Sequence, residues 1–152
     1  ARRSLKALKR VRKSIIDDEY YIGFASAPAL LEIAALVLEG EALAKRKRYE
    51  DAIAKLERAV RIEDGLLYNE PPDWYFPVRH ILGAVLRDAG LPGEAEVVYW
   101  ADLKEHPDNG YALFGLQQAL EAQGKTDLAA HIEGKFKQAF NQADVALTSS
   151  RF

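Results

Sequence analysis

Three histidines are the first candidates for chemistry in this sequence, since an imidazole can bind zinc or transfer protons near neutral pH. They are His80, His106 and His131, and none of them stands at zinc-ligand spacing from another candidate ligand or within an HExxH motif. The sequence contains no cysteine, which excludes disulfides and thiolate chemistry. We interpret the histidines as structural or surface residues, and we expect neither a metal nor a cofactor.

Other motifs of enzymatic chemistry are also missing from the sequence. It has no GxxxxGK[ST] phosphate loop, no GxGxxG turn and no GxSxG nucleophile elbow. The acidic pairs Asp17-Asp18 and Glu63-Asp64 fall at predicted helix ends, where a solvated carboxylate needs no catalytic explanation. The sequence therefore predicts a protein that is not an enzyme.

Positive charge is concentrated at the start of the chain. Residues 1–13 hold seven basic side chains and no acidic one, although the whole chain has a net charge of −2. Within residues 1–16 the apolar side chains share one helical face: Leu5, Leu8, Val11 and Ile15. A basic helix is typical of binding to nucleic acid or to an acidic partner, but base-stacking aromatic residues are missing from it. We favour a helix of a truncated upstream repeat, whose apolar stripe packs on the next helix or on a second chain.

The helices are best defined between Arg79 and Asn109, where the pattern predicts two helices joined by a tight turn. Apolar residues at helical spacing form one stripe in 78–86 and another in 95–103. Gly90 ends the first helix, because glycine readily adopts the left-handed conformation of a C-cap. Pro92 suits the first turn of the second helix, and Pro107 ends it.

Small and aromatic residues of this hairpin stand at the spacing of the tetratricopeptide repeat (TPR), a family that the chain resembles at Leu82-Gly83, Gly90, Ala95, Tyr99 and Pro107. A preceding copy matches at Gly40, Tyr49, Ala52, Leu56 and Ala59, and a following copy at Leu116, Leu120, Gly124 and Ala129. Ala95 and Ala129 are 34 residues apart, which is the TPR period, whereas Ala52 and Ala95 are 43 apart. Nine residues are therefore inserted between the first two copies.

A narrower resemblance links residues 69–86, residues 109–124 and the final SSRF to the C-terminal end of long bacterial multi-repeat TPR proteins, whose activity is unsettled. It covers roughly residues 30 to 152 and implies a fragment or a short relative of a larger protein. The chain has no methionine, so we expect its native start, and any targeting signal there, to be missing. No apolar run is long enough for a membrane span, so we expect a soluble protein, cytoplasmic by default.

The resemblance implies an all-α fold of about seven helices, in which antiparallel hairpins stack as a short right-handed α-solenoid. We expect a single domain over residues 1–152. Its predicted parts are a helix at 1–16, a connector at 17–27, repeat one at 28–64, an inserted loop at 65–75, repeat two at 76–108, repeat three at 109–141 and a tail at 142–152. The tail either caps the last exposed apolar face or is disordered.

In the TPR family the first helices of successive repeats line a concave groove that receives an extended peptide or a helix. By this resemblance the groove positions are Val37, Glu41, His80, Ala84, Arg87, Phe114, Gln118 and Glu121, with Tyr111 at the rim. Arg87 is the main cation among them, so we do not expect capture of a terminal carboxylate. In the inserted loop Trp74 and its aromatic neighbours Tyr68 and Tyr75 either anchor a partner or fill a gap in their own repeat.

One departure from the repeat pattern concerns Arg79 and Asp102, which are charged where the pattern prefers an aromatic and a small residue. Antiparallel helices bring the two positions near one another. A lone buried charge is costly, so we predict that Arg79 and Asp102 form an ion pair or share a polar network.

Three functions remain open on the sequence. The first is a protein-interaction scaffold that binds a peptide or a helix in its groove. The second is an assembly or capping module of a larger repeat protein, which dimerises through Leu5, Leu8 and Val11. The third is a nucleic-acid binder through the basic first helix, whose mark is binding that weakens steeply with salt.

Overall fold

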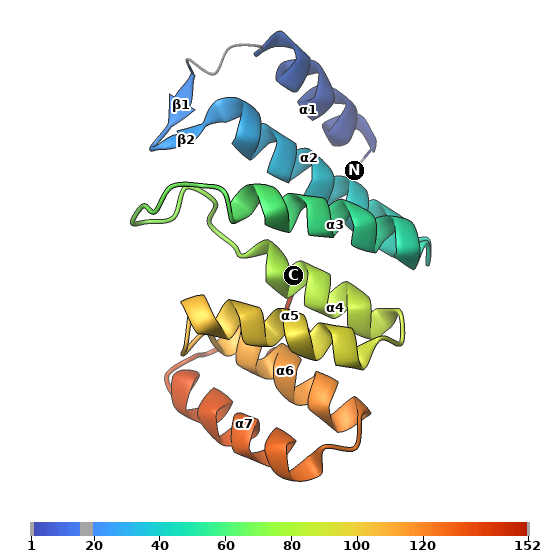
Figure 1. The fold of residues 1–152 in the computed structure, drawn as a ribbon, viewed down its shortest axis with the longest axis vertical. Helices are drawn as coiled ribbons and strands as arrows, with labels where there is room; N and C mark the ends of the chain where they lie inside the picture. Colours follow the sequence, from blue (N-terminus) through green and yellow to red (C-terminus); the bar gives the residue numbers. More distant parts are fainter. Residues whose placement is uncertain (1, 16–19, 152) are drawn as a thin grey trace. The chain divides into compact units, whose positions relative to one another are not determined.

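The computed structural model describes residues 2–15 and 20–151, and it shows an all-α protein built from successive helices (Figure 1). Within the described residues there are seven helices: α1 (Arg2–Ser14), α2 (Ala27–Ala44), α3 (Tyr49–Glu63), α4 (Val78–Asp88), α5 (Pro92–Glu105), α6 (Gly110–Ala122) and α7 (Thr126–Ala139). Neighbours in sequence pack together, α1 on α2, α2 on α3, α5 on α6 and α6 on α7. The prediction of an all-α fold of successive helical hairpins is confirmed.

The chain divides into two compact units, residues 1–78 and residues 79–152. In the first unit α2 and α3 form the central hairpin. Ser26 caps α2, because its hydroxyl accepts a hydrogen bond from the amide of Ala29, and Pro28 occupies the first turn. Gly40 of α2 lies against the side chain of Leu56 on α3, so a missing side chain lets the two helices approach closely.

The predicted connector at 17–27 contains a short β-hairpin that the sequence did not suggest. Its strands β1 (Tyr21–Ile22) and β2 (Ala25–Ser26) pair antiparallel, with Tyr21 opposite Ser26. Gly23 in the turn has φ +65°, a left-handed conformation that glycine adopts without strain. Residues 17–19 lie outside the described part of the chain.

The segment between α3 and α4 folds back onto this β-hairpin. The carboxylate of Asp73 accepts hydrogen bonds from the amides of Phe24 (3.1 Å) and Ala25 (2.9 Å), and Asn69 donates to its other oxygen at 2.7 Å. A single carboxylate therefore ties residues 69–73 to a turn that lies some fifty positions earlier in the sequence.

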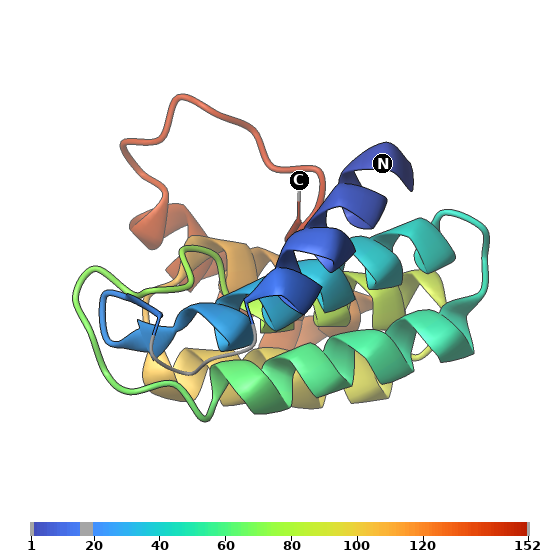
Figure 2. The same cartoon turned by 90° about the horizontal axis from the view of Figure 1, so that it is seen from above.

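The second unit consists of α4 without its first residue, Val78, of α5, α6 and α7, and of the C-terminal segment. Asn109 caps α6, accepting hydrogen bonds from the amides of Tyr111 and Ala112. After α7 the chain leaves as a long irregular loop and then returns to its own unit (Figure 2). Residues 141–146 of this loop are exposed, whereas Ser150 is buried.

Candidate functional site

Tyr99 of α5 lies at the centre of the second unit and is fully buried. Its ring lies against Gly83 of α4 and Gly115 of α6, and a methyl group at either glycine would overlap the ring carbons. The ring therefore fills a space that exists only because both neighbouring helices lack a side chain there. Gly83 is one of the small residues that match the repeat pattern, and the structure shows that its missing side chain makes room for the ring of Tyr99.

The hydroxyl of Tyr99 meets the C-terminal segment. The phenol oxygen is 2.6 Å from the hydroxyl of Ser150, and the same serine hydroxyl donates to the backbone carbonyl of His80 at 2.9 Å. Burial raises the pKa of Tyr99 to about 12, while the charges of Arg87 and Arg151 oppose the increase. The phenol is therefore protonated at every physiological pH.

The next residue, Arg151, extends the contact of this segment to the end of α4. Its guanidinium lies 2.7 Å from the carboxylate of Asp88, and its backbone amide donates to the Ser149 hydroxyl at 3.3 Å. Sequence reasoning left the tail open between a cap and disorder and named none of its residues as part of a site. Helical periodicity carries no signal for an irregular segment, so only the terminal SSRF could have suggested it.

His80, predicted to line a groove, lies instead inside the second unit. Its Nε2 is 2.9 Å from the Oδ2 of Asp102, and both side chains are 1% exposed. His106 approaches the other carboxylate oxygen of Asp102 at 3.6 Å. The polar network predicted around Asp102 is present, but the partner found for it is His80, whereas the sequence argument named Arg79; a pair with Arg79 itself stays a prediction.

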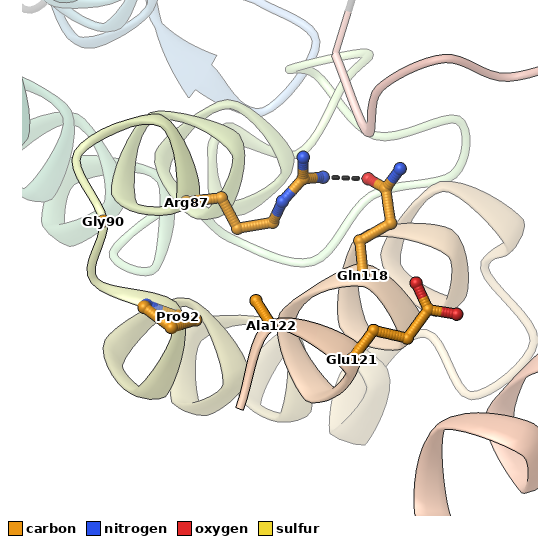
Figure 3. A pocket seen from close by; sticks show the side chains of 6 residues that line it. All are labelled: Arg87, Gly90, Pro92, Gln118, Glu121 and Ala122. Atoms are coloured by element: carbon orange, nitrogen blue, oxygen red, sulfur yellow. Dashed lines mark hydrogen bonds between the residues drawn. The ribbon is translucent and has the colours of Figure 1, made fainter. Parts of the chain in front are cut away.

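Three of the predicted groove residues line one open hollow of about 610 Å³ in the second unit (Figure 3). Arg87 of α4 and Gln118 of α6 point toward one another across it and are joined by a hydrogen bond, and Glu121 lies one helical turn beyond Gln118. Gly90, Pro92 and Ala122 complete the lining. The hollow thus carries one guanidinium, one carboxylate and one amide on a small apolar floor.

The two predicted aromatic groove residues contact α7. Phe114 lies against Phe136, with ring centroids 5.4 Å apart. Tyr111 stacks on His80 at 6.0 Å and meets the edge of Phe140 at 5.8 Å. Both side chains are half-buried. Ala84 is buried in α4, so it offers no accessible surface to a partner.

The predicted site residues of the first unit lie on α2, in the loop and on α1. Val37 and Glu41 are half-buried on α2. Trp74 is also half-buried, while Tyr68 and Tyr75 are 83% and 78% exposed, so the loop both covers its own unit and presents aromatic rings to solvent. On α1, Leu5 and Leu8 are half-buried and Val11 is 46% exposed.

A network of two ion pairs links α1 to α2 and α3 in the first unit. Glu39 of α2 pairs with Lys9 of α1 and, at 3.1 Å, with Lys55 of α3. Burial raises the pKa of Glu39, but the two lysines outweigh it, so that this pKa lies below its usual value. The carboxylate is therefore ionised at neutral pH and links all three helices.

The described residues bring together no group of three or more side chains that could hold a metal ion. Among the same residues no helix is both long and apolar enough to cross a membrane. The sequence matches no known protein-family model, and no curated protein is significantly similar to it. The TPR resemblance therefore stays a prediction from the repeat spacing and residues described above.

Proposed function

We propose that this chain is a TPR-like protein-interaction scaffold that binds a segment of a partner protein on the surface formed by α4 and α6. The observation that supports the proposal is the shared hollow of Arg87, Gln118 and Glu121. The TPR resemblance implied these positions as groove residues, and they come from the first helices of two successive predicted repeats. Their mixed polar character suits hydrogen bonding to the backbone and side chains of an extended peptide.

The test is an affinity capture from a lysate of the organism that encodes the chain, read by mass spectrometry. One bait is the unaltered chain, and the second carries Arg87→Glu and Gln118→Ala. A third bait carries Lys104→Glu, a matched charge reversal at an exposed position of α5. We expect a protein that the first and third baits retain and the second loses, provided that circular dichroism shows equal helix content in all three. Retention of the same proteins by all three baits would contradict the proposal.

A second candidate is an assembly module, and it is favoured by the exposed apolar surface of α1. Val11 on α1 and Leu38 on α2 are both exposed, and a hollow of about 410 Å³ opens between α1 and the α2–α3 hairpin, with Leu5, Leu38 and Leu43 in its lining. Self-association through this surface predicts a mass that rises with concentration in sedimentation equilibrium. The variant Val11→Glu would then remain monomeric over the same concentrations.

A further inference from the structure

The contact between the second unit and residues 149–151 has the properties of a bound ligand. Ser150 has no exposed surface, and its hydroxyl has one proton, which it donates to the carbonyl of His80. The phenol of Tyr99 must therefore be the donor in the 2.6 Å hydrogen bond to Ser150. The helices thus offer a donor, the phenol of Tyr99, and an acceptor, the carbonyl of His80, and the Ser150 hydroxyl hydrogen-bonds to both.

The groups that receive Ser150 belong to rigid elements. The carbonyl of His80 is part of α4, and Tyr99 is held by the two glycines on either side of its ring. Both positions are set by the packing of the helices, so we expect the helices to present the same donor and acceptor when the tail is displaced. We call this site, formed by the His80 carbonyl, the Tyr99 hydroxyl and the Asp88 carboxylate, the hydroxyl socket.

The third member of the socket adds charge selectivity. Asp88 pairs with Arg151, whose side chain is 17% exposed, so a cation directly after the hydroxyl residue is held at the end of α4. A charge-assisted pair of this kind distinguishes arginine from neutral and acidic residues at that position. The socket therefore reads two consecutive side chains, a small hydroxyl and then a cation.

Among the described residues of the tail, the buried one is Ser150, near its end. Residues 141–146 are exposed, so the stretch between α7 and Ser149 adds little to the stability of the unit. The covalent connection through residues 141–148 holds the tail near the socket at an effective concentration on the order of millimolar. Release of the tail would break the hydrogen bonds of Ser150 and the ion pair between Arg151 and Asp88.

We propose that the hydroxyl socket is a recognition site for an extended segment in which a serine is followed by an arginine, and that residues 149–151 occupy it as an internal ligand. A partner segment of the same chemistry binds by displacing the tail. The inference rests on the proposed function, since it names the chemistry of a peptide that the α4–α6 surface would take.

The experiment uses the full chain in two forms. In the opened form the tail carries Ser150→Asp and Arg151→Glu, which place a carboxylate against the carbonyl of His80 and another against Asp88. The probe is a fluorescein-labelled peptide of residues 145–152, read by fluorescence anisotropy, and circular dichroism verifies that both forms have the same helix content. We expect the opened form to bind the peptide at least tenfold more tightly than the unaltered chain, whose own tail competes.

Two matched controls test the chemistry. A peptide with Ser150→Ala should bind the opened form at least tenfold more weakly, since it leaves the buried phenol of Tyr99 without its acceptor. When Asp88→Lys is combined with Ser150→Asp alone, Arg151 of the tail meets a like charge; binding of the unaltered peptide should then fall and binding of a peptide with Arg151→Glu should rise. Equal affinity of the opened form for the unaltered, the Ser150→Ala and the Arg151→Glu peptides would overturn the proposal, as would equal affinity of the opened form and the unaltered chain.

The outcome is separable from that of the proposed function. If a lysate partner is lost with Arg87→Glu and Gln118→Ala but no peptide binds the opened form, the proposal of a scaffold is supported and the proposal of a recognition site at the hydroxyl socket is contradicted. If the opened form binds the peptide selectively but no lysate partner is captured, the proposal of a recognition site at the hydroxyl socket is supported and the proposal of a scaffold that recruits a partner protein is not.

Discussion

His80 and Asp102 form a buried pair between α4 and α5, with 2.9 Å from Nε2 to Oδ2 and almost no solvent contact for either side chain. Burial without a partner is costly for an imidazole and for a carboxylate, and each supplies the partner of the other. The pair also holds the backbone of His80 in place, and the carbonyl of that residue accepts the hydrogen bond from Ser150. A structural pair thus supports one wall of the hydroxyl socket.

Replacement of Asp102 by alanine should lower the free energy of unfolding by about 1–3 kcal/mol, because Nε2 of His80 loses its buried partner. Asp102→Asn should cost less, since its amide can still hydrogen-bond to the ring. Urea denaturation followed by circular dichroism measures both values. The control is Asp144→Ala, an exposed carboxylate in the tail loop; an Asp102→Ala variant as stable as this control would show that the pair contributes nothing.

The packing of Tyr99 predicts opposite effects for the same substitution at different glycines. Gly83→Ala and Gly115→Ala should each destabilise by about 1–3 kcal/mol, because the added methyl group overlaps the buried ring. Gly134→Ala should instead stabilise by up to about 1 kcal/mol, since this glycine lies inside α7 with no atom near the added group.

A double-substitution cycle identifies the cause of that destabilisation. Combining Gly115→Ala with Tyr99→Leu should cost less than the sum of the two single changes, because the leucine leaves room for the methyl group. Additive costs, measured by chemical denaturation, would show that the clash with Tyr99 is not what Gly115 avoids.

Ionisation of Tyr99 should unfold the second unit at high pH. The pKa of its phenol is about 12 in the folded chain, above the ordinary value of 10.0, so the protonated form is favoured by folding. The stability this contributes is fully present below pH 10 and is lost as the pH rises through about 12. Urea midpoints between roughly pH 9 and pH 11.5 should fall more steeply for the unaltered chain than for Tyr99→Phe; parallel curves would rule out this role for the phenol.

The parts that the sequence predicted well are those governed by helical periodicity. The first helix of the predicted hairpin, which has its apolar stripe at 78–86 and ends before Gly90, is α4, and the second, which has Pro92 in its first turn and ends before Pro107, is α5. Glycine and proline mark these ends for local reasons that do not depend on the rest of the fold. Such signals place elements along the chain and say little about which side chains meet.

His80, a partner of Asp102 that the sequence did not predict, shows a limit of that reasoning. A pattern of repeats gives the position of a side chain on its helix to within about one residue, and Arg79 and His80 differ by one residue, or about 100° around α4. The rotation of α4 places His80 against Asp102, and the buried neighbours that set this rotation come from the whole unit. The sequence prediction placed His80 in the groove and did not consider it as a buried partner for Asp102.

Ser150 was beyond sequence reasoning for a different reason. Its contacts join positions 51 and 70 residues away, and the segment that carries it has no periodicity. Asp73 is a similar case, since it binds amides in a turn that the sequence did not predict. Polar side chains that bind another segment's backbone leave no pattern in the sequence around them.

Asp73 should decide whether the loop between α3 and α4 stays docked on the β-hairpin. Asp73→Ala removes the acceptor for two backbone amides and for Asn69, so we expect faster proteolysis within residues 64–77 by about tenfold, equivalent to roughly 1.4 kcal/mol. Asp73→Asn keeps one oxygen acceptor, so its cleavage rate should lie between those of the unaltered chain and Asp73→Ala. Chymotrypsin, which cleaves at the exposed Tyr68 and Tyr75, is the reporter. Equal cleavage rates in all three chains would show that the carboxylate does not hold the loop.

Glu39 should control the docking of α1 in a pH-dependent way. Because its pKa is lowered in the folded chain, the stability it contributes is present above the ordinary value of 4.5 and is lost as the pH falls through the lowered pKa. Glu39→Gln should therefore reduce hydrogen-exchange protection of the α1 amides at pH 7, by less than about 1 kcal/mol because the lysines are partly exposed. Below the lowered pKa the variant and the unaltered chain should show equal protection. The control is Glu57→Gln on α3, which loses only a 4.0 Å pair with Arg61 and should leave α1 unchanged. Equal protection of α1 in all three chains at pH 7 would show that its packing rests on Leu5 and Leu8 alone.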